Sequence, residues 1–327
     1  MSLTNPFAET KSSIAIIPNV DLTTELNKIG KYADLAKVSV ILLDMTGKPK
    51  RSGGFSMFSG RDAGTTRYSA SLVKIAAMYA AFRLRKNFRE AANETTVTKP
   101  DEMIGQVMDA WKPIVEKAPG SDKDFPNLKR IFAISGSKGS WIIDFDQAYF
   151  KRMQGMIGPS DNHDASYCIL SLGYKYIQGA LAAEGLYSGG GLWLSGDYAQ
   201  GRDGDPEPVS KSHQAASATS VATFLTLLMS QGLVKDSASA TMRGLMTNCY
   251  MTRILDAQKP PRPYAPYSFG KLGRGPDGTF HDCAVIERPI ANGTIIRYCA
   301  VILGSQGIGP LWRIGTFLDD VVEAAHT

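Results

Sequence analysis

Ser71 and Lys74 form the pair of residues with the clearest chemical potential in this sequence. They lie three positions apart in "RYSASLVKIAAMYAAF", where a long apolar run begins. Residues at this spacing share one face of a helix, so the amine can reach the hydroxyl. A partly buried lysine can accept the serine proton, and a helix N-terminus favours the developing anion. The alternative is an ordinary polar first helical turn, since Ser135 and Lys138 repeat the spacing in the glycine-rich loop "SGSKGS".

Two further motifs follow this pair along the chain. "GPSDNHDASYCILSLG" places Ser160, Asp161 and Asn162 before an apolar helix, where the alternative is a simple N-cap. "SFGKLGRGPDGTF" places Lys271 and Gly273 at the end of a predicted strand. A glycine at such a position lets the backbone of a substrate approach closely.

These motifs resemble, in kind and in order, those of the active-site serine penicillin-recognising enzymes, which include class A β-lactamases and penicillin-binding proteins. The stretches "ASATSVATFLTLLMSQGLV" and "GPDGTFHDCAVIERP" are also similar to segments of that family. The resemblance runs from about residue 22 to the end, with additional residues between 84 and 145.

The resemblance implies a role for each matching residue. Ser71 would be the acylated nucleophile and Lys74 its proton acceptor. Ser160 would relay the proton to the leaving group, supported by the charge of Lys271. Asn162, Gly273 and Arg274 would bind the substrate. The backbone N–H groups of Ser71 and Arg274 would form the oxyanion hole. Asp161 would be a structural residue of the helical lobe.

The first departure from the family concerns release of the acyl group. Class A β-lactamases use a glutamate on the Ω-loop, held beside an asparagine four residues later, whereas no asparagine occurs here between Asn162 and Asn248. Asp197 or Glu184 could position a hydrolytic water, provided that it lies within hydrogen-bond reach. The alternative for both residues is a surface or loop carboxylate.

The second departure is Leu272, which stands where the family has a hydroxyl residue that helps to hold the substrate carboxylate. Losing a charge-assisted hydrogen bond costs roughly 1.5–3 kcal/mol, or about ten- to a hundredfold in affinity. Arg274 or Lys271 could compensate, or the substrate could lack that carboxylate. The stretch that corresponds to the Ω-loop also contains three aromatic residues. They would suit an apolar or aromatic acyl group, or else pack the loop: Tyr187, Trp193 and Tyr198.

Strands near both ends of the chain, with helices between them, must position these residues. Residues 38–45 form a β-rich apolar run, and the segment around Asn292-Gly293 predicts a hairpin. We therefore predict an α/β fold in which an antiparallel sheet is built from both termini with flanking helices, and an all-helical lobe is inserted. Helices are predicted over 71–92, 145–157, 164–183, 217–230 and 311–325. The predicted lobes are 1–67 with 262–327 (α/β) and 68–261 (mainly helical), together one catalytic unit.

Composition limits the class of protein. With 327 residues, 43% hydrophobic and 20% charged, the chain is expected to be globular, as one large domain or two packed lobes. The densest basic run, "RLRKNFR", is followed at once by Glu90 and Glu94, which indicates a solvated helix face rather than a nucleic-acid surface. No membrane span or secretory signal is apparent, so a cytoplasmic location is expected, or a periplasmic or secreted one if the N-terminus was trimmed.

The cysteines and histidines indicate no metal or cofactor. Four single cysteines without metal-type spacing predict reduced, buried thiols. The alternative is a disulfide between Cys283 and Cys299, although a two-residue turn at Asn292-Gly293 would place Cys283 opposite Ile302. His163 and His281 are interpreted as structural or surface residues.

The predicted function is a serine hydrolase that acts through an acyl-Ser71 intermediate on an amide or ester, with a β-lactam, a peptide or a small ester or amide as substrate. The alternative is a penicillin-binding or sensor-like protein that is acylated and then deacylates slowly. A scaffold without catalysis is disfavoured because the four motif residues Ser71, Lys74, Ser160 and Lys271 are all present. The sequence carries no signal for the oligomeric state.

Overall fold

The computed structural model describes residues 3–8, 15–18, 37–47, 54–120, 124–187, 190–234 and 237–327. The chain divides into two compact units. The helical unit comprises residues 1–10, 74–188 and 193–213, and the sheet unit comprises residues 11–73, 189–192 and 214–327. Residues 214–261, which we predicted within the helical lobe, thus group with the strands. The expected start of the family resemblance near residue 22 lies outside the described residues.

The sheet unit contains a seven-stranded sheet in the order β1-β3-β2-β12-β11-β10-β9. The prediction of a sheet built from both ends of the chain is confirmed. The sheet is mixed rather than wholly antiparallel as predicted, because β1 runs parallel to β3 and β9 parallel to β10. Its strands are β1 (Ala15–Pro18), β2 (Ser39–Asp44), β3 (Gly54–Arg61), β9 (Thr247–Asn248), β10 (Phe269–Arg274), β11 (Thr279–Pro289) and β12 (Ile295–Gln306).

The β11–β12 hairpin forms around Asn292-Gly293 as predicted, but with a different register. Its loop spans residues 290–294 and is closed by hydrogen bonds of 2.9 Å between the backbones of residues 290 and 294 and of residues 293 and 290. A longer loop shifts the pairing, so Cys283 lies opposite Val301 instead of Ile302. All four cysteines are free and buried, as predicted.

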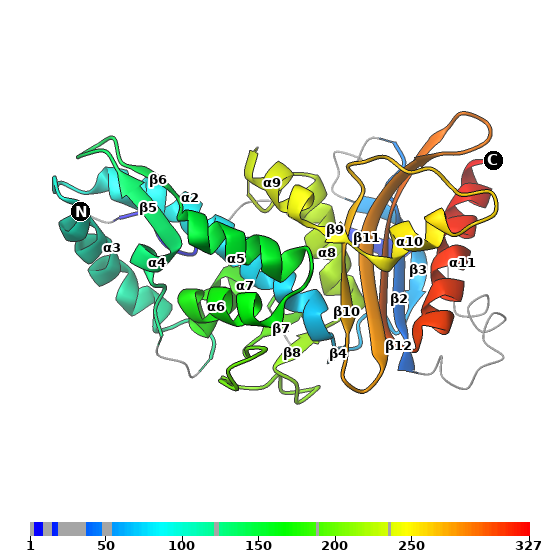
Figure 1. The fold of residues 1–327 in the computed structure, drawn as a ribbon, viewed down its shortest axis with the longest axis horizontal. Coiled ribbons are helices and arrows are strands. Elements are labelled where there is room, and N and C mark those ends of the chain that lie inside the picture. The colour runs from blue at the N-terminus through cyan, green and yellow to red at the C-terminus, as the bar shows by residue number, and fades with distance from the viewer. Residues whose placement is uncertain are drawn as a thin grey trace. The chain divides into compact units, whose positions relative to one another are not determined.

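Helices cover both faces of this sheet (Figure 1). Alternate strand residues such as Val40, Leu42 and Ile286 form one apolar cluster with α10 (Tyr250–Asp256) and α11 (Ile308–His326). The opposite face receives α8 (Ala218–Met229), which contacts β2, β11 and β12 and contributes nothing to that cluster. The unit also contains the 3-10 helix η2 (Ala70–Val73), α9 (Ser237–Leu245) and the antiparallel pair β4 (Arg67–Tyr68) and β8 (Gln214–Ala216).

The helical unit is organised around α2 (Lys74–Glu94), which is buried on all sides over its first two turns. Five elements of the unit contact it: α3 (Pro100–Val115), β6 (Ile142–Phe145), α5 (Gln147–Ile157), α6 (Asn162–Leu172) and α7 (Tyr174–Ala183). We predicted an all-helical lobe, but the unit also contains a strand pair, in which β6 runs antiparallel to β5 (Phe132–Ser135). The remaining elements are α4 (Leu128–Ile131) and β7 (Leu192–Leu194), where the division between the units falls.

The predicted helix 164–183 is divided into α6 and α7 by Gly173. This residue has φ +76°, and a Cβ there would lie 2.5 Å from the backbone oxygen of Asp124. Only glycine adopts such a backbone conformation and fits such a close approach without strain. The break ends α6 and lets α7 start in a new direction.

No described helix has the length and apolarity needed to cross a bilayer. Within the same residues, no group of three or more His, Cys, Asp or Glu side chains is arranged to hold a metal ion.

Candidate active site

In the helical unit, the structure brings three of the predicted site residues together around one ammonium group. Lys74 is fully buried at the first position of α2. Its Nζ donates hydrogen bonds of 2.8 Å to the backbone oxygen of Ser160 and 2.8 Å to Oδ1 of Asn162. The Ser160 hydroxyl lies 3.5 Å from the same nitrogen, and the backbone oxygen of Asp161 lies 3.3 Å away. The lysine is therefore hydrogen-bonded to the whole Ser-Asp-Asn motif.

The backbone around this motif explains how one nitrogen meets three successive residues. Ser160 has φ +68°, in the left-handed region that non-glycine residues rarely occupy. Asp161 is the N-cap of α6, and its carboxylate accepts a 2.8 Å hydrogen bond from the Asp164 N–H. That N–H lowers the pKa of the Asp161 carboxyl. The capping interpretation thus holds for Asp161.

Tyr198 completes the surroundings of Lys74. The lysine Nζ lies 4.4 Å from the centroid of the Tyr198 ring. The Tyr198 N–H donates a 3.0 Å hydrogen bond to the Ser166 hydroxyl on α6, which fixes the loop beside the helix. Tyr187 and Trp193 instead stack on each other with centroids 4.5 Å apart, as expected if they pack the loop. The sequence suggested that Tyr198 either faces an acyl group or packs the loop, and it gave no sign of the contact with Lys74.

In the sheet unit, Ser71 lies on η2, and β10 packs against this 3-10 helix. Gly273 makes the close approach possible, because a Cβ there would lie 2.8 Å from the backbone oxygen of Ser69 and 3.0 Å from the Leu72 nitrogen. Ala70, immediately before Ser71, has φ +48°, a strained conformation for alanine. First-turn N–H groups of a helix have no intrahelical acceptor. Ser71 thus sits where its backbone N–H can serve an oxyanion.

Lys271 on β10 is also fully buried. Its Nζ donates a 2.9 Å hydrogen bond to the backbone oxygen of Leu272. Burial lowers the pKa of Lys271 to about 8, an effect that Cys283 and Asp282 partly offset. Leu272 itself packs against the cluster formed with α10 and α11, so its side chain has a core role.

Arg274 ends β10 with its side chain exposed. Its guanidinium lies over the Phe280 ring, with the central carbon 5.4 Å from the ring centroid. Leu272 to Arg274 pair with β11 along one edge only, because β9 pairs with β10 at residues 270 and 271. Among the described strands, none covers the other edge of 272–274, so a substrate backbone could pair there.

Glu184 and Asp197 are both engaged with other groups. The Glu184 carboxylate forms an ion pair with Arg83 and accepts a 2.9 Å hydrogen bond from the Tyr79 hydroxyl, with both charged side chains almost wholly buried. Asp197 accepts hydrogen bonds from the backbone N–H groups of residues 199, 200, 201 and 202 at 2.9–3.3 Å. One carboxylate therefore belongs to a buried ion pair and the other to its own loop.

The two histidines occupy different environments. His163 is exposed in the first turn of α6. His281 is buried, and its Nδ1 accepts a 3.1 Å hydrogen bond from the Gly304 N–H. Burial lowers the pKa of His281 to about 4, so the ring is neutral at physiological pH. His281 is a structural residue, as interpreted from the sequence.

Asp282 is a buried carboxyl group that sequence reasoning did not single out. It accepts 2.8 Å hydrogen bonds from the N–H groups of Tyr250 and Met251, where the N-cap of α10 provides no side-chain acceptor. Burial raises the pKa of Asp282 to about 7. The available sign of a buried carboxyl group was an acidic residue at the start of the apolar run "DCAVI".

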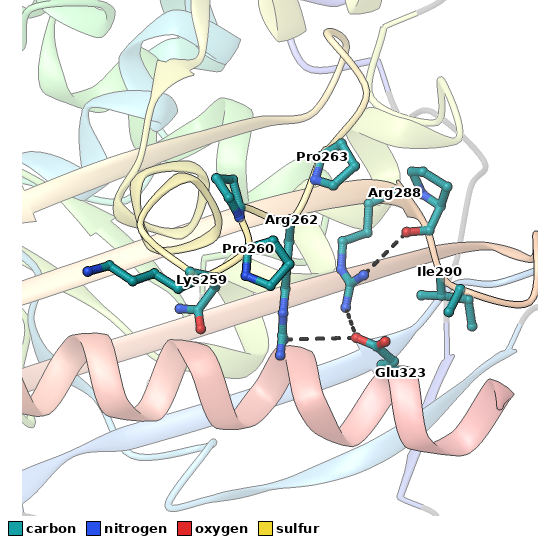
Figure 2. Close-up of a pocket in the computed structure, with 11 residues that line it drawn as sticks. Lys259, Pro260, Arg262, Pro263, Arg288, Ile290 and Glu323 are labelled. Carbon is teal, nitrogen blue, oxygen red and sulfur yellow. Dashed lines mark hydrogen bonds and ion pairs between the residues drawn. The ribbon is translucent and has the colours of Figure 1, made fainter.

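A cavity of about 470 Å³ lies elsewhere in the sheet unit and includes none of the predicted site residues (Figure 2). Its wall contains Pro260, Pro263 and Ile290, together with the charged side chains of Arg288 and Glu323. Arg288 forms ion pairs with Glu323 and with Asp319, the latter at 2.7 Å. This network joins β11 to α11, which is a structural role.

No protein-family model matches this sequence, and no curated protein matches it. The fold is similar to several solved structures over nearly the whole chain. A class A β-lactamase from Mycobacterium abscessus matches with 16% identity and a TM-score of 0.56, covering 93% of this chain and 99% of that one. The TLA-3 extended-spectrum β-lactamase matches with 12% identity and a TM-score of 0.55, covering 94% and 98%.

PBP-A matches with 13% identity and a TM-score of 0.54, covering 95% of this chain and 99% of that one. These coverages leave no large part of either chain unmatched, and the similarity includes both compact units. The chain has the fold of the class A β-lactamase and penicillin-binding protein superfamily.

Proposed function

We propose that this protein is a serine hydrolase that forms an acyl-Ser71 intermediate with an amide or ester substrate. The observation that carries the proposal is the hydrogen bonding of buried Lys74 to Ser160 and Asn162. An ordinary polar helix start would leave its lysine in solvent. Here the lysine instead joins the second predicted motif.

The proposed reaction uses Lys74 in its neutral form. Ser71 Oγ attacks the substrate carbonyl while Lys74 takes the hydroxyl proton. The backbone N–H groups of Ser71 and Arg274 stabilise the oxyanion. The proton then passes from Lys74 to Ser160, whose hydroxyl lies 3.5 Å away, and from Ser160 to the leaving group as the bond to the carbonyl carbon breaks. Water later cleaves the Ser71 ester and regenerates the hydroxyl.

The substrate class follows from Leu272. A leucine has no hydroxyl to offer a substrate carboxylate, and this side chain packs, partly buried, against the apolar cluster. We propose that uncharged esters and amides react at least as well as penicillins. Nitrocefin and a panel of short-chain p-nitrophenyl esters test this preference, and faster turnover of nitrocefin would contradict it.

Covalent labelling tests the proposed nucleophile. Native protein mixed with penicillin G or a fluorophosphonate should gain one adduct mass, located on the Ser71 peptide, and Ser71→Ala should gain none. Ser135→Ala is the matched control, because it removes the serine of the second Ser-x-x-Lys pair and should label normally. An adduct that survives Ser71→Ala would refute the assignment.

A second candidate is a penicillin-binding or sensor-like protein that stays acylated. It is favoured because both candidate carboxylates for activating a deacylating water bind other groups: Glu184 forms an ion pair with Arg83, and Asp197 accepts hydrogen bonds from its own loop. A variant of PBP-A, similar to this chain at 14% identity with a TM-score of 0.54, is described as an acyl-enzyme complex with penicillin G. Intact-mass spectrometry over time separates the candidates, because a hydrolase loses its adduct within minutes and a sensor retains it for hours.

A further inference from the structure

We infer that Tyr198 is a positioning residue for Lys74: its ring holds the lysine ammonium against Ser160 and Asn162 and stabilises the charge that Lys74 gains with the Ser71 proton. The catalytic part of this inference rests on the proposed function. The contact itself does not.

The geometry is that of a cation over an aromatic face. The distance of 4.4 Å from Nζ to the ring centroid is within the roughly 6 Å over which a ring attracts a cation. Lys74 is fully buried, and desolvation strengthens such contacts. An exposed lysine would gain far less from the same ring.

The loop holds the ring in place independently of the lysine. The Tyr198 N–H is bound to the Ser166 hydroxyl at 3.0 Å. The preceding residue, Asp197, accepts hydrogen bonds from the backbone N–H groups of residues 199 to 202. Both contacts fix the backbone of the loop at Tyr198, which holds the phenol ring beside Lys74.

An aromatic ring differs from a carboxylate in its effect on a proton acceptor. The oxygen acceptors of Lys74 at Ser160, Asp161 and Asn162 are neutral groups. A neutral ring stabilises the ammonium moderately, whereas a carboxylate at that place would bind it strongly and oppose its deprotonation. Tyr198 therefore favours charge on Lys74 without preventing the lysine from giving up its proton.

Among the charged neighbours, the Asp161 carboxyl attracts Lys74 electrostatically, while its own hydrogen bond comes from the Asp164 N–H. Arg83 is paired with Glu184. Two further ion pairs lie on α2 or on elements that contact it, and in each pair the two charges are bound to one another: Arg85 with Asp144 and Arg152 with Asp164.

A series of substitutions at Tyr198 tests whether the electrons of the ring matter. The readout is the rate of Ser71 labelling at a fixed alkaline pH, where native labelling no longer rises with pH. Tyr198→Phe should stay within about twofold of native, since the ring is retained. Phenylalanines with one, two and three ring fluorines should label progressively more slowly, and Tyr198→Leu should be about 2- to 30-fold slower.

The matched control is Tyr167→Leu, which removes a tyrosine ring from the same unit. That ring lies over the guanidinium groups of Arg130 and Arg152, at 5.3 and 5.6 Å, instead of over Lys74. Labelling of this variant should match native. A packing role for Tyr198 would give equal rates across the fluorinated series, and that result would overturn the inference.

Lysine NMR provides a readout that does not depend on catalysis. The ring current of Tyr198 should shift the ε-methylene protons of Lys74 upfield in native and Tyr198→Phe proteins, and the shift should vanish in Tyr198→Leu. If this signature appears while Ser71 is never labelled, the contact is supported and the proposed function fails. If labelling occurs without the signature, the proposed function stands and the role of Tyr198 is refuted.

Discussion

Lys74 in the helical unit and Lys271 in the sheet unit are both fully buried, yet their surroundings differ. Lys74 meets two oxygen acceptors at 2.8 Å and the face of an aromatic ring, which together replace much of the hydration of an ammonium. Lys271 donates to a backbone oxygen and lies near the thiols of Cys283 and Cys249, and its pKa falls to about 8. The two buried lysines thus differ in their partners: Lys74 has oxygen acceptors and an aromatic ring, whereas Lys271 has a backbone oxygen, two thiols and the Asp282 carboxyl, which only partly offset the effect of burial.

The largest expected effect is at Lys74, the proposed proton acceptor of Ser71. Lys74→Met should slow Ser71 labelling by about 10²- to 10⁴-fold, the range of a positioned general base. The measurement is the rate of adduct formation by mass spectrometry. Lys138→Met, in the β5–β6 turn, is the matched control and should label at the native rate. Equal rates for both variants would show that Lys74 is only a buried structural lysine.

A third buried cation, Arg83, extends the comparison because it has a carboxylate partner. Arg83→Met leaves Glu184 buried without its counter-ion, so the free energy of unfolding should fall by about 3–5 kcal/mol. Urea unfolding measures this loss. Lys129→Met breaks an exposed pair with Asp101 in the same unit and should leave stability unchanged. A native-like Arg83→Met would contradict the placement of this ion pair.

Lys271 makes stability depend on pH. Below about pH 8 the folded protein holds a protonated lysine in a site that disfavours charge, whereas the unfolded chain keeps its proton up to about 10.5. Stability should therefore rise between these values, by at most about 3 kcal/mol. Lys271→Met should abolish this rise and stabilise the protein at neutral pH by a similar amount. A rise that persists in the variant would have to come from other groups.

The smallest effect is expected at Asp197. Asp197→Asn keeps one acceptor oxygen but loses the charge that the loop N–H groups favour, so stability should fall by about 1–2 kcal/mol. The lifetime of the Ser71 adduct should not change if Asp197 is structural. A lifetime at least tenfold longer would instead identify it as the group that activates the deacylating water.

Sequence reasoning succeeded where short-range rules dominate. Alternating and helical patterns located β2, the β11–β12 hairpin, α5, α8 and α11 to within a few residues. It offered a helix cap as the alternative for Ser160, Asp161 and Asn162, and Asp161 is that cap, because capping depends on adjacent residues. It missed the division at Gly173, where the close approach of Asp124 from outside the helix decides the conformation.

The partners of the candidate site residues were less predictable. Nothing near Glu184 in the sequence indicates that its carboxylate forms an ion pair with Arg83, which lies on another helix. The same holds for Tyr198 and Lys74, which are brought together by the path of a loop with few regular elements. The hairpin register also depended on loop length, which the Asn-Gly signal alone does not determine.

The buried cysteines have a practical consequence for reagents that react with nucleophiles. Cys249, Cys283 and Cys299 are enclosed in the sheet unit and Cys168 in the helical unit, and burial raises the pKa of all four thiols, that of Cys249 to about 12. Thiols that stay protonated and enclosed react slowly with electrophiles. An electrophilic probe applied to the folded, unmodified chain therefore meets little competition from sulfur. The native protein can be profiled with serine-directed warheads without first replacing its cysteines.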